Sequence, residues 1–225
     1  MVTCTTPPFR AAVRLNSGVM PQENMLPPLT IPDLSKLNAY SEWAAVVRAL
    51  AGGGSRDQTA HILLTNAVRL LDASVRDYEL GREALGAFHA RDPSHMAIGH
   101  IMRATTHFES CIWHFERFIK HVRALRSFRT AEPELKALIP RDLSFLKQSA
   151  EHAITDLRHT LAHLEGAALR GELPQGAKIA LVPVEDGLQI AEHSVDWSQL
   201  AEWLTDAHTC VASLANFRPQ NPAGA

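Results

Sequence analysis

Apolar residues recur along most of the chain at intervals of three and four, the spacing that places them on one face of a helix. This pattern predicts five helices, which begin near Asp33, Asp57, Ser94, Asp142 and Asp196. The first ends near residue 50, the second runs into the eighties, the third passes Leu125 and the fourth reaches about Arg170. Short connections between consecutive helices favour antiparallel neighbours, so the pattern predicts an antiparallel helical bundle.

The period of the pattern changes from helical spacing to short strands between the last two predicted helices. Residues 178–184 and 188–191 predict two strands joined by a Glu-Asp-Gly turn. Pro183 has no N–H to donate, which confines its strand to the edge of a sheet. Asp196 and Gln199 stand three apart, as in a capping box that starts a helix. The expected fold class is therefore mainly α, with a small β-hairpin before the last helix.

The two ends of the chain lack this periodicity. Residues 1–31 hold five prolines, and residues 218–225 resemble them in composition. Such segments bury too little apolar surface to offset the entropy of ordering, so both are predicted to be disordered. Residues 32–217 are predicted to form one domain, a length within the usual range for a single domain.

Charge and cysteine usage narrow the class of protein. Asp and Glu number 24 against 22 Lys and Arg, so no basic field covers the whole molecule. Cys4, Cys111 and Cys210 are an odd, widely spaced set without a CxxC pair, which argues against a disulfide framework. Neither a signal peptide nor a window of membrane-spanning length is evident. We expect a cytoplasmic protein without membrane contact.

The fourth predicted helix gathers polar groups that are typical of acid–base catalysis. On a helical wheel, His152, Asp156, His159 and His163 form a stripe roughly opposite the apolar side, and Arg158 lies between the two. Imidazole, carboxylate and guanidinium on one rigid face supply a proton acceptor, a proton donor and a fixed positive charge. The candidate catalytic residues are therefore Arg158, His163, His159 and Asp156, and a phosphate ester is the expected target.

The segment Arg158-His-Thr-Leu-Ala-His163 resembles the Arg-x4-6-His signature of the HEPN superfamily, which is named for nucleotide binding in higher eukaryotes and prokaryotes. His159 agrees with the polar residue that commonly follows the arginine in that family. Members of the family are helical bundles, and many are metal-independent ribonucleases. The resemblance implies that Arg158 contacts the scissile phosphate, that His163 handles a proton of the 2′-hydroxyl or the leaving group, and that His159 orients the site.

The resemblance also implies the partners of the protein. It implies RNA or a nucleotide as ligand, and a homodimer in which two copies of the motif face each other across the helix that carries Arg158 and His163. RNA supplies its own nucleophile in the 2′-hydroxyl, so this chemistry requires neither a metal nor another cofactor. An isologous contact would also explain an outward polar stripe, because a second subunit would cover it.

Two other interpretations of the same helix remain open. A noncatalytic interaction or ligand-binding protein of the same fold, which could have an unknown protein partner, would carry the same stripe. The histidines could also belong to an ordinary solvated helix face. The first interpretation predicts that changing Arg158 or His163 alters affinity only, whereas an enzyme would lose activity with its fold intact.

The third predicted helix carries a second set of basic residues at heptad spacing. Histidines recur every seven residues, with two arginines at matching offsets, and the six are His100, His107, His114, His121, Arg103 and Arg117. As a candidate RNA-binding edge they could follow a phosphate backbone, with Trp113 or Phe128 stacking on bases. In the competing interpretation these are boundary positions of a bundle, and Arg117 and Lys120 pair with nearby glutamates.

A metal site is the weakest of the interpretations. His159 and His163 stand four apart, a spacing that suits two imidazoles on one ion, and Asp156 lies three residues before His159. The chain nevertheless has no Glu-x-x-His and no His-Glu-x-x-His motif. We therefore predict no metal ligands.

Overall fold

The computed structural model describes residues 29–51, 53–90, 98–173 and 178–219. The elements, in chain order, are α1 (Ser41–Ala51), α2 (Gln58–His89), α3 (Ile98–Ser127), α4 (Pro133–Ala137), the 3₁₀ turn η2 (Ser144–Leu146), α5 (Gln148–Leu169), β1 (Val182–Val184), β2 (Gly187–Ile190), β3 (His193–Asp196) and α6 (Trp197–Ala215). The predicted class is confirmed: the fold is mainly α, with a small antiparallel sheet before the final helix.

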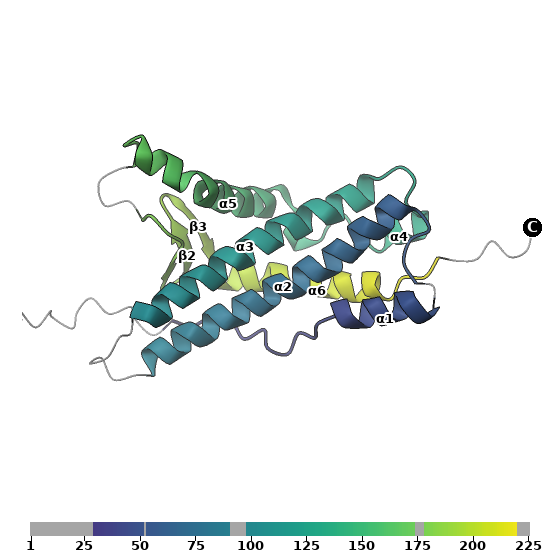
Figure 1. Cartoon of the computed structure of the whole chain (residues 1–225), viewed down its shortest axis with the longest axis horizontal. Coiled ribbons are helices and arrows are strands. Elements are labelled where there is room, and N and C mark those ends of the chain that lie inside the picture. Colours follow the sequence, from purple (N-terminus) through teal and green to yellow (C-terminus); the bar gives the residue numbers. More distant parts are fainter. Residues whose placement is uncertain (1–28, 52, 91–97, 174–177, 220–225) are drawn as a thin grey trace, which may run out of the picture.

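Two long helices form the layer nearest the viewer in Figure 1. α2 and α3 run antiparallel and make the most extensive contact between two elements of the described chain. They approach closely where Gly81 of α2 meets the ring of Phe108, since a Cβ at Gly81 would stand 2.8 Å from that ring. Behind them lie α5, the sheet and α6, and α1 packs on both α2 and α6 (Figure 1). The apolar faces of both layers form one hydrophobic cluster.

The sheet has three strands where the pattern predicted two. Its order is β1-β2-β3, with both pairings antiparallel, and Leu188 lies opposite Pro183 on one side and Val195 on the other. Pro183 therefore lies on an edge strand, as predicted. Leu188, Ile190 and Val195 are buried against the helices. The third strand was missed because its sequence, His-Ser-Val-Asp, offers only one apolar residue, Val195.

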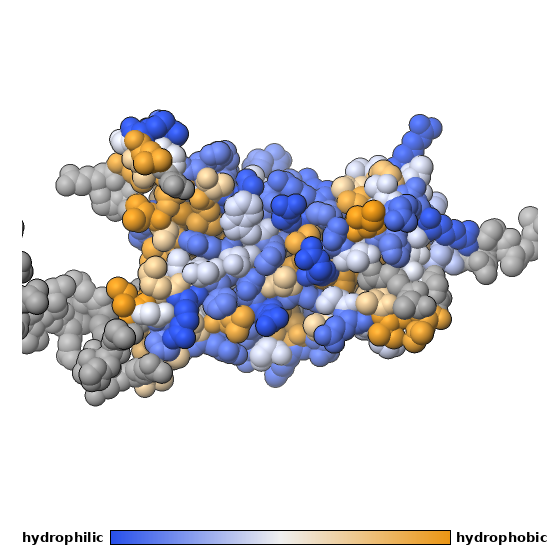
Figure 2. Space-filling model, in the orientation of Figure 1, coloured by the Kyte–Doolittle hydropathy of each residue, from blue (hydrophilic) through white to orange (hydrophobic). Residues whose placement is uncertain are grey.

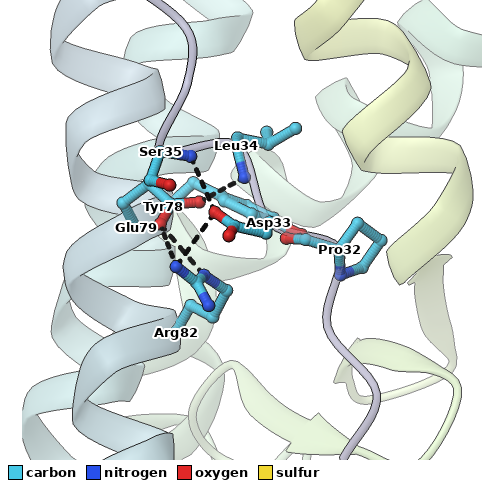
Figure 3. A network of polar contacts seen from close by, with 7 residues as sticks. All are labelled: Pro32, Asp33, Leu34, Ser35, Tyr78, Glu79 and Arg82. Carbon is cyan, nitrogen blue, oxygen red and sulfur yellow. Dashed lines mark hydrogen bonds and ion pairs between the residues drawn. The ribbon is translucent and has the colours of Figure 1, made fainter.

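The first helix begins eight residues later than predicted. Residues 33–40 run along α2 as a strap, and the carboxylate of Asp72 accepts hydrogen bonds from the N–H groups of Tyr40 and Ser41, at 2.8 and 2.5 Å, which caps α1. Figure 3 shows how side chains of α2 hold the first residues of the strap. Glu79 accepts the N–H of Leu34 at 2.7 Å and two bonds from Arg82, while Tyr78 donates to the carbonyl of Pro32 at 3.1 Å. Leu34 and Leu37 recur at helical spacing, yet the N–H of Leu34 donates to Glu79 on α2, and the N–H of Leu37 donates to the carbonyl of Leu34 in a single turn.

Two predicted helix starts also need correction. The helix expected from Asp142 begins at Gln148, because η2 occupies residues 144–146 and buries Phe145 in the core. Asp196 does occupy the cap position of α6, but its side chain makes no capping hydrogen bond, so the capping box with Gln199 does not form. The sequence thus predicted where α6 begins but not whether the side chain of Asp196 would form a capping hydrogen bond.

The packed region extends slightly beyond the N-terminal boundary of the predicted domain. The predicted disordered segments fall mostly on residues 1–28 and 220–225, which lie outside the described residues. Leu29 and Ile31, which fall in the predicted disordered segment, pack against the core, and Phe217 is buried at the other end. The ordered region therefore starts slightly earlier than residue 32.

The cysteines of the described chain belong to the packed interior. Cys111 and Cys210 are both free and buried. Burial raises the pKa of each thiol to about 12, which keeps it protonated and unreactive at neutral pH. Cys4 lies outside the described residues.

Apolar side chains on the surface gather at two places. In Figure 2 most of the visible face is hydrophilic, with apolar atoms at the end of the molecule near the end of α5 and over α1. The large hydrophobic side chains that are most exposed are Leu50, Leu169, Ile98, Ile179 and Met102. Among the described helices, none combines the length and the apolar character that crossing a bilayer requires.

Asp57 is expected to contribute to the acid sensitivity of the fold. Its carboxylate caps α2 by accepting the N–H of Ala60 at 2.9 Å and also accepts the hydroxyl of Thr130 at 2.7 Å. These bonds lower the pKa of Asp57 below its ordinary value of 3.8. A lowered folded-state pKa means that the stabilisation is complete above about pH 4 and is lost as the pH falls through the folded-state value.

Thermal unfolding of the parent and of Asp57→Asn, followed from pH 7 to pH 2, checks this expectation. Asparagine keeps an N-cap acceptor but does not titrate. The variant should therefore lose less of its melting temperature between pH 4 and pH 2 than the parent does. Parallel curves for the two proteins would show that Asp57 makes no contribution of this kind.

Candidate functional site

The helix that carries the candidate catalytic residues is fixed at its C-terminal end and along one face. Ile154 and Leu157 are fully buried, and the helix packs against α3, the sheet and η2. At its C-terminal end Gly171 has a positive φ of 68°, and the N–H groups of Gly171 and Glu172 bond to the carbonyls of Ala168 and Ala167. This glycine-terminated end is the stop that the sequence predicted. The rotation of α5 about its axis is therefore set.

The predicted polar stripe lies on the outward face of α5. His152, Asp156, His159 and His163 are all exposed, and none of their side chains forms a hydrogen bond or an ion pair with another residue of the described chain. The rings of His159 and His163 lie side by side, with their centroids 4.3 Å apart. Two adjacent imidazoles without internal partners remain available to a ligand or to a second protein chain.

Arg158 points away from this pair. Its guanidinium carbon stands 4.2 Å from the centre of the Trp113 ring on α3, a cation–π contact, and Arg158 is half-buried. Its Nε is buried without a hydrogen-bond partner among the described residues. Five residues of helix separate Arg158 from His163 by roughly 140° of rotation. Within one protomer, the arginine therefore borders the α3–α5 seam while the histidines face outward.

Trp113 contacts an arginine of the same chain, which its sequence position did not predict. Sequence reasoning offered it as a base-stacking residue, but Arg158 covers the ring and Trp113 is half-buried. Phe128, the other candidate for stacking, packs against the hydrophobic core. Contacts between helices such as Arg158–Trp113 have no signature in sequence spacing, because the two residues are 45 positions apart in the chain.

The six basic residues at heptad spacing on α3 do not form one continuous exposed edge. His100 is buried and lies beside Arg103, with 3.0 Å between the guanidinium and Nδ1 of the ring. His121 contacts the carbonyl of Arg117 through Nδ1 at 2.7 Å, and Arg117 itself is exposed. The helix therefore uses part of the set for its own packing, as the boundary interpretation expects. The pairing of Lys120 with Glu116 is confirmed.

His107 and His114 share one carboxylate on the neighbouring helix. Nδ1 of His114 stands 2.9 Å from Asp77 Oδ2, and Nδ1 of His107 stands 3.5 Å from Asp77 Oδ1. The three line a groove of about 730 Å³ between the strap, α2 and α3, where Arg69 and Arg76 are exposed. Asp77 was missed because its position on α2 gave no sign of which α3 residues it would meet.

The described residues offer no metal centre. No group of three or more histidine, cysteine, aspartate and glutamate side chains in these ranges is arranged to hold an ion. His159 and His163 could supply two ligands, but no third stands beside them. What the outward face of α5 can do chemically is exchange protons and donate hydrogen bonds to an anion.

Comparison of the chain with protein-family models, curated proteins and solved structures gives no match.

Proposed function

We propose that this protein is an RNA-cleaving module related to the HEPN superfamily, a metal-independent endoribonuclease that acts through the outward face of α5. The observation that carries the proposal is the pair His159–His163, with rings 4.3 Å apart on an exposed helix face. The segment from Arg158 to His163 also agrees with the family signature in spacing and in the polar residue at 159. A ribonuclease without a metal needs an accessible imidazole that can exchange a proton with its substrate, and both features place such an imidazole on α5.

The proposed reaction needs only groups that the chain and its RNA substrate supply. The imidazole of His163 removes the proton of a ribose 2′-hydroxyl, and the 2′-oxygen attacks the adjacent phosphorus. The bond between phosphorus and the 5′-oxygen breaks, and a protonated imidazole gives that oxygen a proton. The products are a 2′,3′-cyclic phosphate and a 5′-hydroxyl. His159, whose ring contacts that of His163, orients it, Asp156 adds a carboxylate on the same face, and Arg158 neutralises charge on the phosphate.

A homodimer is part of the proposal. Two rings at 4.3 Å lie too close together to act as base and acid on opposite sides of one phosphate. A second copy docked on the face of α5 would place its own histidines across from His163, which supplies the missing acid. The unpaired outward groups His152, Asp156 and His159 would then be covered by this contact.

The position of Arg158 favours a second candidate, a noncatalytic binding protein of the same fold. Its guanidinium lies on Trp113 and turns away from the histidines, so catalysis requires it to act from the seam or to leave the ring. A module that only binds RNA, a nucleotide or a protein partner would not need Arg158 and His163 to contact the same phosphate group.

Incubation of the purified protein with a mixed RNA pool in excess EDTA separates the two candidates. The enzyme should release fragments with 2′,3′-cyclic phosphate ends, and sedimentation should show a dimer at the concentration used. If the protein shifts RNA in a mobility assay but leaves it intact, the noncatalytic binding module is the better description.

Trp113→Leu is expected to weaken RNA binding by about two- to fivefold, because the cation–π contact that positions Arg158 contributes roughly 0.5–1 kcal/mol at a partly exposed site. Fluorescence anisotropy with a labelled RNA measures the effect. Arg158→Ala should weaken binding at least as much, and the double variant should be no worse than Arg158→Ala alone. Additive losses in the double variant would mean that Trp113 contacts RNA by itself.

A further inference from the structure

Three arginines meet at the end of the bundle where α3 ends and α4 follows (Figure 1). Arg123 and Arg126 come from the last turns of α3, and Arg141 comes from the connection between α4 and η2. Together with Ser127 and Leu146 they line a pocket of about 340 Å³. Its side chains therefore carry three positive charges and no negative one.

Among the described residues, only one of the three arginines has a partner for its side chain. Arg123 donates to the carbonyl of Leu146 at 2.7 Å and pairs with Glu151 of α5 at 2.8 Å, which ties α3 to the start of α5. Its Nε is buried without a partner among the described residues. The side chains of Arg126 and Arg141 make no hydrogen bond and no ion pair within the described part of the chain. Two of the three positive charges thus remain uncompensated.

The electrostatics of α3 account for only part of this arrangement. A cation near the C-terminal end of a helix interacts favourably with the helix dipole, which explains an arginine at position 126. The same dipole does not explain why Arg141, from a separate segment, faces the same pocket. Like charges brought together repel one another, and Asp142, although next in sequence, does not line the pocket. An anionic ligand would remove that repulsion.

We propose that Arg123, Arg126 and Arg141 form a binding site for a phosphoryl group. Guanidinium groups bind phosphate oxygens through paired N–H donors, and two free guanidiniums match the charge of a phosphate monoester. The pocket volume is in the lower range for small-molecule sites, so it admits the phosphate with part of the molecule that bears it. The phosphate can come from a free phosphorylated compound or from the 5′ end of a nucleic acid.

The test uses pyrophosphate as the probe and isothermal titration calorimetry as the measurement. The full-length parent is compared with Arg126→Gln/Arg141→Gln, which leaves the bonds of Arg123 in place. The matched control is Arg69→Gln/Arg76→Gln, which removes two exposed arginines from α2. We expect saturable binding by the parent and the control, and affinity at least about tenfold weaker in Arg126→Gln/Arg141→Gln because it loses charge-assisted hydrogen bonds.

Two further ligands distinguish the sources of the phosphate. These are 2′-O-methyl oligonucleotides with a 5′-phosphate or a 5′-hydroxyl, which cannot be cleaved through the 2′-oxygen. Tighter binding of the phosphorylated oligonucleotide that depends on Arg126 and Arg141 identifies a nucleic-acid end. Equal binding of the two oligonucleotides, beside arginine-dependent binding of pyrophosphate, identifies a small phosphorylated compound.

The proposal is overturned if the parent binds neither pyrophosphate nor the 5′-phosphorylated oligonucleotide. It is also overturned if the two double variants lose affinity equally, or if Arg126→Gln/Arg141→Gln binds as the parent does. Thermal melting of each variant checks that the fold is unchanged. Because none of these readouts requires RNA cleavage or His163, the phosphoryl site and the proposed ribonuclease activity succeed or fail separately.

Discussion

Under the proposed ribonuclease function, His163→Ala is expected to reduce RNA cleavage by about 100- to 10,000-fold, the usual contribution of a positioned general acid or base. His163 is exposed on α5 and contacts only the ring of His159 among the interactions of the described chain, so its removal should leave the fold intact. Initial rates on a single RNA substrate in EDTA, with melting temperatures of both proteins, measure the effect.

The matched control for this variant is His61→Ala. His61 is a half-buried histidine on another long helix, α2. The control should retain the activity of the parent within a factor of about two, as for a surface substitution away from the site. Equal cleavage by the parent and His163→Ala would place the activity elsewhere, and the shared Asp77 carboxylate with His107 and His114 would be the next site to change.

Leu157→Ala should lower the free energy of unfolding by about 2–5 kcal/mol, because it removes a side chain that is fully buried between α5 and the rest of the core and leaves a cavity. This effect should appear in chemical denaturation as a lower midpoint with little change in slope. A loss of this size is a large part of the stability of a typical domain.

His159→Ala, two positions further along the same helix, is the internal comparison for Leu157→Ala. His159 is exposed on the outward face, so its replacement should change the stability by no more than about 0.5 kcal/mol. The pair of variants tests the rotation of α5 on which the functional proposal depends. Similar losses in both would mean that the outward face is itself packed, for example against a second copy that stabilises the protein.

The fold class followed from sequence spacing because burial acts residue by residue along a helix. The stripe that includes Ala150, Ile154 and Leu157 had to face a core, and this placed His159 and His163 outward before any neighbour was known. The glycine at 171 and the proline at 183 constrain the backbone locally, so the end of α5 and the edge strand were also predictable.

Helix starts were less predictable because they depend on where backbone N–H groups find acceptors. Leu34 and Leu37 have helical spacing, yet Asp72 and Glu79 on α2 bind the N–H groups of residues 34, 40 and 41, so α1 begins at Ser41. The acceptors lie more than thirty residues away in sequence. No local pattern identifies them.

By itself, then, the sequence determined which faces are apolar, the order of the long helices and the place of the sheet between the last two, and that α5 presents a row of titratable side chains. The tertiary structure decided which side chains meet across helices: Arg158 with Trp113, His107 and His114 with Asp77, and Arg141 with the end of α3. The physical reason is that periodicity fixes the direction of a side chain from its own helix axis, whereas a contact depends on the packing of a second element. The pocket lined by Arg123, Arg126 and Arg141 joins segments that are separate in sequence, so it forms only when those segments pack together.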